Sequence, residues 1–212
     1  MKNKENKSKN DKPKKEISEG MIIFGTVLII MLIFVSIGAF LHAKVNPKLQ
    51  TETSNGFVFT KSGISWYTDM VSQEYNAQIT ANFRYAPSEV KEIPVTGDVR
   101  LFFASKGNMS YFTFNPTDNL TYMNLAAADL AKYLKVLNGV TLEAACTQNV
   151  SSACVDRPII SCESEKKIPV IYVRNSAISS VEMNGNCLTI QGSGEGLLKA
   201  YNKVLFLWYG IL

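Results

Sequence analysis

Met21–Leu41 reads MIIFGTVLIIMLIFVSIGAFL, and this stretch decides how the rest of the chain is organised. It is 21 residues long, carries no charge, and has only Thr26 and Ser36 as polar side chains. As a helix it is about 31 Å long, which matches the roughly 30 Å hydrocarbon core of a bilayer. One uninterrupted helix also pairs its backbone groups internally, as lipid requires. The stretch predicts a transmembrane signal-anchor at residues 21–43, with the lipid bilayer as its first partner.

Residues 1–20 form a polar tail on one side of this segment. They contain seven Lys, four acidic residues and almost no apolar side chains, so burial cannot offset the entropy of ordering them. We predict a disordered tail. Only Lys44 and Lys48 follow closely on the other side, so the positive-inside bias places the N-terminus in the cytoplasm and the C-terminal part outside the cell membrane. The basic tail is interpreted as an orientation signal, and no nucleic-acid partner is expected.

Two other interpretations of the apolar segment stay open. A cleaved secretory signal has a shorter apolar core and a small-x-small cleavage site, whereas residues 41–43 (LHA) begin with Leu. Residues 19–21 (EGM) place Gly directly before the apolar helix, which resembles the leader junction of pilin precursors. The junction lacks the Lys or Arg before the Gly, and the Glu soon after it, that this pattern contains. The resemblance implies a filament subunit processed near Gly20.

The remainder predicts a polar stalk at residues 44–56 and one domain at residues 57–212. Pro47 ends the first helix, because the residue before a proline avoids the α region. Short alternating or apolar runs predict strands at residues 57–59, 65–68, 75–85, 99–104, 111–114, 140–145, 168–173, 178–183 and 188–191. An open strand edge, such as that of residues 75–85, would suit binding by strand addition.

Two segments of this domain have helical periodicity instead. Within residues 120–137, apolar side chains recur at i, i+4 and i+7, with Asp118 or Asn119 as the start signal and Gly139 as the stop signal. Residues 195–209 are apolar on more than one face, which predicts a buried helix. The fold class is therefore α+β, with about two main helices on a mostly antiparallel sheet.

All four cysteines lie in the predicted outer domain. Their even number in an exported segment indicates two disulfides, and three pairings are possible. We favour Cys146–Cys154, which would close a polar loop, and Cys162–Cys187. A structural zinc site is the alternative, but seven, seven and 24 intervening residues do not match paired zinc knuckles.

Three sequons for N-glycosylation lie in the same part of the chain. They begin at Asn108, Asn119 and Asn149, in predicted turns or at a helix start. Asn115 is followed by Pro and is excluded. Each remaining Asn is a possible glycan acceptor if the organism glycosylates exported proteins.

Histidine usage narrows the chemistry of the outer domain. His42, at the predicted membrane boundary, is the single His of the chain, which excludes His-based triads and His-ligated metals outside. Bridged cysteines would leave no thiolate nucleophile. No cofactor, no metal and no catalytic residue is therefore predicted, and an enzyme is disfavoured.

Three weaker patterns were weighed against ordinary loops. Residues 192–196 (GSGEG) follow a predicted strand and open a helix, but they lack the dinucleotide and P-loop signatures. Residues 164–167 (SEKK) match a bare Ser-x-x-Lys motif without its partner motifs. Glycosidases use paired carboxylates, and Glu163 with Glu165 and Glu89 with Glu92 are candidates by residue type alone. Both pairs lie in polar segments, and nothing in the sequence places them in a cleft.

The sequence thus predicts a single-pass membrane protein that presents a disulfide-stabilised domain. We expect a binding or assembly module of the cell envelope, with a protein partner or self-association at the membrane surface. The first alternative is the pilin-like filament subunit. The second is an exported hydrolase or transferase using carboxylates or a Ser-Lys pair, which requires a pocket with a buried acid or Lys of shifted pKa.

Overall fold

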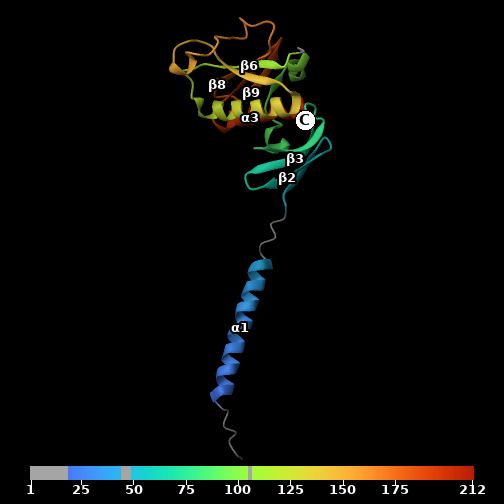
Figure 1. Cartoon of the computed structure of the whole chain (residues 1–212), viewed down its shortest axis with the longest axis vertical. Coiled ribbons are helices and arrows are strands. Elements are labelled where there is room, and N and C mark those ends of the chain that lie inside the picture. Colours follow the sequence, from blue (N-terminus) through green and yellow to red (C-terminus); the bar gives the residue numbers. More distant parts are fainter. Residues whose placement is uncertain (1–18, 44–48, 105–106) are drawn as a thin grey trace, which may run out of the picture. The chain divides into compact units, whose positions relative to one another are not determined.

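The computed structural model describes residues 19–43, 49–104 and 107–212 (Figure 1). The chain divides into two compact units, Met1–Lys48 and Leu49–Leu212. The first unit contains helix α1, Glu19–Ala43, and the second contains all the strands and the remaining helices. Residues 1–18 of the predicted tail and residues 44–48 of the predicted stalk lie outside the described residues.

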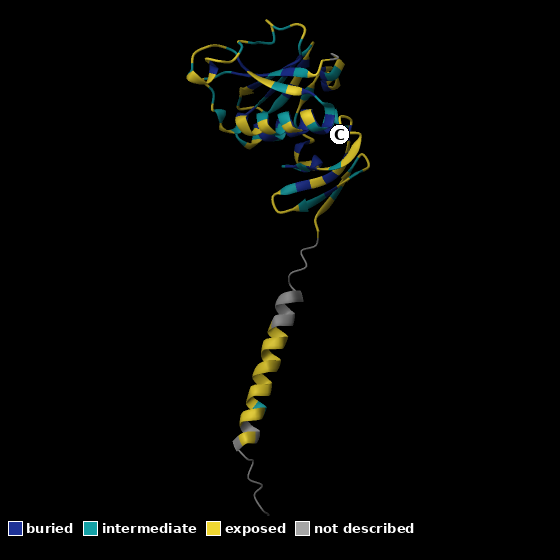
Figure 2. Cartoon of the chain, in the orientation of Figure 1, coloured by how far each residue is buried: buried dark blue, intermediate teal, exposed yellow. Residues whose placement is uncertain are grey.

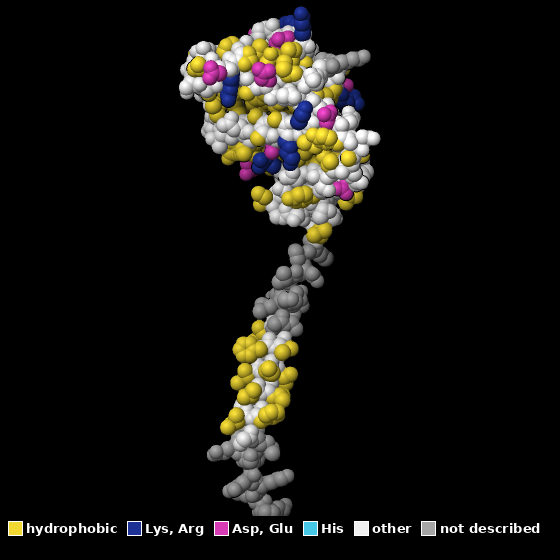
Figure 3. Space-filling view, in the orientation of Figure 1, with side chains coloured by type: hydrophobic (Ala, Val, Ile, Leu, Met, Phe, Trp, Pro, Cys, Tyr) yellow, Lys and Arg dark blue, Asp and Glu magenta, His cyan; other side chains and the backbone are white. Residues whose placement is uncertain are grey.

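Helix α1 covers the apolar segment from which the sequence analysis started. Its described large apolar side chains are exposed, from 49% at Leu28 to 71% at Phe24 (Figure 2). Figure 3 shows hydrophobic side chains along the visible face of its described part. Within the described part of the chain, no helix combines the length and the apolarity that crossing a membrane requires.

The second unit begins with a four-stranded antiparallel sheet, which we call the small sheet. Its strands follow each other in space as in sequence, in the order β1 (Thr51–Ser54), β2 (Phe57–Ser62), β3 (Ser65–Ser72) and β4 (Ala77–Phe83). Strand β1 corrects the prediction of a stalk over residues 44–56. Polar residues form this strand because it is an edge that pairs with β2 through a tight turn, in which Asn55 and Gly56 both have positive φ.

A six-stranded sheet, the large sheet, follows. Its spatial order is β5-β9-β10-β8-β6-β7, and every pair is parallel except β9 with β10. The strands are β5 (Val95–Thr96), β6 (Met109–Phe114), β7 (Thr141–Cys146), β8 (Val170–Asn175), β9 (Ser180–Asn184) and β10 (Cys187–Gly192). The α+β class is confirmed, and the small sheet is antiparallel. The expectation of one mostly antiparallel sheet is wrong for the large sheet, because a crossover helix makes β6 and β7 parallel.

That crossover is α3 (Leu120–Asn138), and the second long helix is α4 (Glu195–Trp208). Both match their predicted ranges. The side chain of Asn119 accepts from the Thr121 backbone N–H at the start of α3, and Gly139 ends the helix in the left-handed conformation. The predicted strand at residues 99–104 is wrong, because Val99–Ala104 is a 3₁₀ helix, η1. A short helix, α2 (Pro87–Val90), comes earlier in the chain.

The core of the unit lies around α4. Nine of its residues are buried, and the helix contacts α2, α3, η1 and both β9 and β10. Phe206 also reaches the small sheet, with ring centroids 5.6 Å from Phe59 and 4.9 Å from Phe83. The interior is therefore shared by the two sheets, and α4 joins them.

Both favoured cysteine pairings are present as disulfides. Cys146 is bonded to Cys154 with Cα atoms 6.0 Å apart, and Cys162 to Cys187 with Cα atoms 5.4 Å apart. The first joins β7 to the 3₁₀ turn Ser152–Cys154, and the second joins a loop to the start of β10. Both bonds therefore hold loops onto the large sheet.

Candidate functional site

The small sheet opens between its two central strands. Strands β3 and β4 are paired over seven residues, from Trp66 with Phe83 to Ser72 with Ala77. Strands β2 and β3 are paired over only three, and the last pair is Thr60 with Tyr67. Beyond that pair the two strands separate instead of continuing the ladder.

Hydrogen bonds to other elements hold the separated strand ends. At the β1–β2 turn, the Ser54 hydroxyl donates to the Ile211 carbonyl over 2.6 Å, and the Asn55 amide donates to the Gly210 carbonyl over 3.0 Å. At the end of β3, the buried Ser72 hydroxyl donates to the Val136 carbonyl over 2.5 Å. One strand end is thus tied to the C-terminal residues and the other to α3, which keeps the strands apart.

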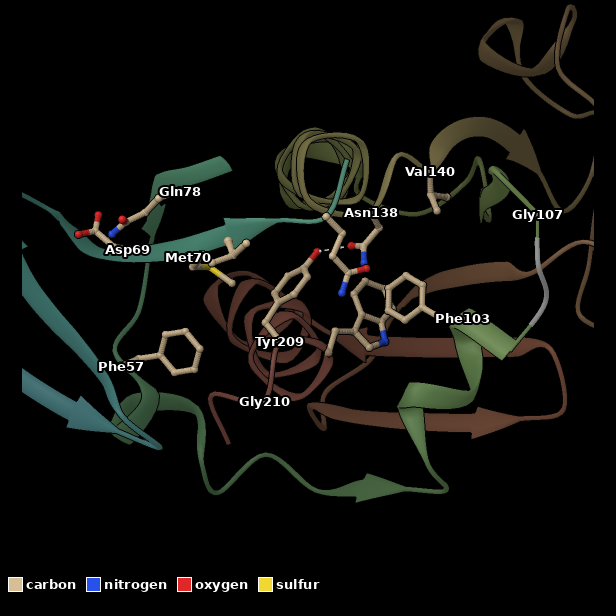
Figure 4. Close-up of a pocket in the computed structure, with 13 residues that line it drawn as sticks. Phe57, Asp69, Met70, Gln78, Phe103, Gly107, Asn138, Val140, Tyr209 and Gly210 are labelled. Atoms are coloured by element: carbon tan, nitrogen blue, oxygen red, sulfur yellow. Dashed lines mark hydrogen bonds between the residues drawn. The ribbon is translucent and has the colours of Figure 1, made fainter. Parts of the chain in front are cut away.

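The separation forms one wall of a cleft of about 770 Å³. Figure 4 shows Phe57 of β2 and Met70 of β3 on either side of the opening, with Tyr209 to their right in this view. The cleft continues past the end of α4 to Asn138 at the end of α3. Its size lies within the range of small-molecule and peptide sites, roughly 300–1,000 Å³.

Tyr209 organises the base of this cleft. Its hydroxyl donates to Asn138 Oδ1 over 2.9 Å, and the Tyr133 carbonyl lies 3.4 Å away (Figure 4). Burial raises the pKa of the Tyr209 phenol, so it stays protonated at neutral pH and acts as a hydrogen-bond donor. The rim is polar, with Gln73, Gln78 and Asp69 among its residues. Aromatic walls with a few amide groups and one carboxylate are suited to binding.

The opposite edge of the small sheet is less open than the sequence suggested. The predicted strand at residues 75–85 is present as β4, and it is an edge strand. However, the Tyr133 hydroxyl donates to the Asn82 carbonyl, and Lys132 Nζ donates to Asn82 Oδ1 over 2.7 Å. Helix α3 therefore covers part of this edge.

A second cavity, of about 610 Å³, contains the buried Lys203 of α4. Lys203 is 9% exposed, and its ammonium donates to the Lys91 carbonyl over 3.0 Å. Burial lowers the pKa of this ammonium group. Sequence analysis missed Lys203, although a Lys within an apolar helix segment was a signal that could have found it.

The hydrolase or transferase alternative requires a pocket with a buried acid or Lys of shifted pKa, and Lys203 meets that requirement. The described residues around it do not provide the nucleophile that the reaction needs. Among the described residues lining this cavity there is no Ser, Thr, Cys or Tyr to act as a nucleophile. The acid that lines it, Asp98, is held by Arg100 through Nε over 2.8 Å and Nη2 over 2.9 Å. The arrangement therefore has a desolvated amine without the partner that a Ser-Lys mechanism needs.

The sequence motifs considered for catalysis are placed in separate loops and turns. In the SEKK segment, Ser164 Oγ interacts with Ser161, while Lys166 Nζ donates to the Cys162 carbonyl. The Glu165 carboxylate accepts from the backbone of Ile168 and Lys167, which lowers its pKa and makes it a poor general acid.

The remaining candidates also have structural roles. Glu89 accepts from the Ala86 backbone N–H over 2.7 Å at the start of α2, while Glu92 lies 3.8 Å from Lys91 on the surface. Glu163 lines a separate cavity of about 350 Å³ beside the Cys162–Cys187 bond. Gly192 lies against the backbone of residue 197, so residues 192–196 form a tight strand-to-helix turn. The structure does not bring any of these groups into the cleft.

The three sequon asparagines are exposed, as their predicted positions in turns and at a helix start suggested. Asn108 precedes β6, Asn119 caps α3, and Asn149 lies in the loop closed by the Cys146–Cys154 bond. The Oδ1 atom of Asn119 already accepts a backbone hydrogen bond, while Ser110 of the first sequon is buried in β6. Glycosylation at these positions stays a prediction.

One ionic cluster lies outside both cavities. Arg84 Nε donates to Asp129 Oδ2 over 2.7 Å and to the Tyr201 hydroxyl oxygen over 3.0 Å. The Tyr201 hydroxyl donates to the same carboxylate. Hydrogen bonding to Asp129 raises the pKa of Arg84, and burial raises that of Tyr201. The cluster ties the end of β4 to α3 and α4.

Comparisons with known proteins do not assign this architecture. No family model matches the chain, and neither a curated protein nor a solved structure is significantly similar to it.

Proposed function

We propose that the chain is a single-pass membrane protein whose extracytoplasmic domain binds a protein partner through the cleft between β2 and β3. The observation that carries the binding role is the opening of the small sheet. Two neighbouring strands stop pairing after Thr60 and Tyr67, and a cavity of about 770 Å³ lies beside the unpaired segments. A sheet interior left open in this way offers both apolar surface and backbone groups to a partner.

The membrane part of the proposal is supported by the sequence. Residues 21–41 contain no charged side chain, and the residues before them are strongly basic. The exposed apolar side chains of α1, such as Phe24 and Met31, need an apolar environment. We place the tail in the cytoplasm, the anchor at residues 21–43, and the domain outside.

The extracytoplasmic placement is supported by the cysteines. Both disulfides lie in the second unit, and α1 contains no Cys. Disulfides persist in oxidising compartments and are rare in reducing ones. Burial of Cys146, Cys154 and Cys187 is consistent with a structural role for the bonds.

Placement is tested by tagging the full chain at each end and treating intact cells with a protease. We expect loss of the C-terminal tag and protection of the N-terminal tag, with the protein retained in membranes after carbonate extraction. Loss of the N-terminal tag alone would reverse the orientation. Release by carbonate would contradict the anchor.

The filament alternative has a different signature. Processing near Gly20 predicts a mature chain that begins at Met21, which mass spectrometry of the native protein measures directly. An intact N-terminus supports the signal-anchor instead. The processed chain would therefore be lighter than the uncleaved signal-anchor protein by the mass of about 20 residues.

The binding role is tested by photo-crosslinking in cells. A photoreactive amino acid replaces Val71, which is 69% exposed and lines the cleft, and in a matched control it replaces Ile178, which is 70% exposed outside the cleft. We expect a discrete crosslinked protein from position 71 only. The same bands from both positions, or none from position 71, would contradict the proposed site.

A further inference from the structure

The alternation of hydrogen bonds in the small sheet identifies which backbone groups face the opening. In an antiparallel pair, alternate residues bond to the partner strand, and a two-residue turn is flanked by a bonded pair. Ser54 and Phe57 flank the β1–β2 turn, so odd-numbered residues of β2 bond to β1. The backbone N–H of Lys61, which is also odd-numbered, donates to the Gln50 carbonyl over 2.9 Å. The even-numbered residues of β2 therefore point toward β3.

The same reasoning applies to β3. Ser62 and Ser65 flank the β2–β3 turn, so the odd-numbered residues of β3 point toward β2. The ladder ends at Tyr67, and the next residues with this orientation are Asp69 and Val71. Among the described residues, the ladder between β2 and β3 includes neither of them, nor Val58 on the facing strand.

The opening is thus bordered by strand edges on both sides. Val58 presents its N–H and C=O from β2, while Asp69 and Val71 present theirs from β3. Unpaired edges of this kind are templates for another strand. Asp69 and Val71 also line the cleft, so the open edge and the cavity belong to one site.

We propose that the partner of this cleft is an extended polypeptide segment that inserts as an additional strand between β2 and β3. The inference rests on the binding role proposed above and names the conformation of the ligand. Backbone hydrogen bonds to both neighbours supply affinity, and side chains that alternate between the two faces supply selectivity.

The two faces of the opening define the side chains of that segment. On the inner face, Phe57 and Met70 flank the opening and line the cleft together with Tyr209, which favours an apolar side chain (Figure 4). On the outer face, Val58 and Val71 are exposed beside Asp69, which is the one charged group among the described lining residues. Charge complementarity favours Lys or Arg at outward positions. The segment therefore alternates apolar and basic residues.

The experiment selects ligands for the full-length protein in detergent micelles from a phage library of random heptapeptides. The binding of enriched peptides is then measured by fluorescence anisotropy. We expect enriched sequences with apolar residues at every second position and Lys or Arg between them. A library that yields no peptide above the empty-micelle background would overturn the proposal.

A matched pair of proline variants tests the open edge of the protein. Val58→Pro removes a backbone N–H that faces the opening and is not used by the β1–β2 ladder. Thr53→Pro removes the corresponding N–H from the outer edge of β1, outside the cleft. One lost backbone hydrogen bond should weaken peptide binding about tenfold in Val58→Pro, and Thr53→Pro should stay within about twofold of wild type. Equal affinity of wild type and Val58→Pro would contradict insertion.

Methylation of the peptide backbone provides a test that does not depend on the folding of a variant. One peptide is N-methylated at its odd positions and a second at its even positions, so that each loses the donors toward one neighbouring strand. Insertion between β2 and β3 predicts that both peptides bind at least about tenfold more weakly. If one peptide retains full affinity, the ligand adds to a single edge, and if both do, it does not bind as a strand.

Failure of the inference can be told apart from failure of the proposed function. A crosslinked partner at position 71, together with binding that is insensitive to N-methylation, would keep the binding role and remove strand insertion. Absence of both the crosslink and the peptide ligands would remove the binding role as well.

Discussion

The two sheets of the second unit differ in how completely their strands are paired. In the large sheet, β10 is paired on both sides over its length, two disulfides hold loops onto the strands, and α4 packs against them. In the small sheet, β2 and β3 share three pairs and then diverge around a cleft. We therefore expect the large sheet to contribute most of the stability, while the small sheet carries the proposed binding site.

The largest expected effect comes from the side chain that joins the two sheets. Replacing Phe206 by Ala removes a fully buried ring from between Phe59 and Phe83, and should lower the free energy of unfolding by about 3–5 kcal/mol. Phe57→Ala, at the half-buried cleft wall, should cost roughly 1–2 kcal/mol. Urea unfolding of both variants measures the difference. Equal losses would mean that the cleft wall is packed as tightly as the core.

The second effect tests the disulfides of the large sheet. The Cys162–Cys187 bond spans 25 residues of sequence and the Cys146–Cys154 bond spans eight. Loop entropy then predicts losses of about 3.5 kcal/mol and about 2.5 kcal/mol when each pair is replaced by Ala. Thermal unfolding of the two double variants compares them. A larger loss for the shorter loop would show that packing around Cys146, rather than loop length, dominates.

The sequence predicted some elements of the second unit correctly and others incorrectly. Periodicity predicted α3 and α4 well, because long amphipathic or apolar helices have a strong local signal. The strand predicted at 99–104 is a 3₁₀ helix, because its aromatic residues pack against Trp208 of α4, a contact that no local pattern contains. The strand-helix-strand order of β6, α3 and β7 could have predicted that the two strands are parallel. The alternation of apolar and polar residues, on which the strand predictions were based, does not give strand direction.

The candidate site was the least predictable part. Its geometry depends on hydrogen bonds between distant segments, such as Ser54 with Ile211 and Ser72 with Val136, which are separated by 157 and 64 residues. Each of these side chains is an ordinary strand or turn residue in its local context. The disulfide pairs were predicted correctly because each bond joins two successive cysteines of the sequence and closes the loop between them.

A smaller effect tests what holds the small sheet open. Ser72 is buried, donates to the Val136 carbonyl and accepts from the Tyr75 backbone N–H. Ser72→Ala leaves both backbone groups without this partner and should cost about 1–2 kcal/mol of unfolding free energy. Hydrogen exchange should also become faster for the end of β3 than for β10. Uniform exchange across both sheets would contradict a role for Ser72 in anchoring the cleft.

The smallest effect is the pH dependence of three buried phenols, one of which, Tyr209, lines the cleft. Burial raises the pKa values of Tyr133, Tyr201 and Tyr209, so the folded protein holds these protons more tightly than the unfolded chain. Their stabilising contribution is therefore complete below about pH 10 and is lost as the pH rises through the folded-state pKa values, by at most about 1.4 kcal/mol per pH unit for each phenol. Tyr209→Phe removes one titrating group, so its free energy of unfolding should fall less steeply between pH 10 and 11 than that of wild type. If Tyr209→Phe follows the wild-type slope in urea titrations, Tyr209 is accessible to solvent, and the cleft extends deeper toward α3 than the hydrogen bond to Asn138 indicates.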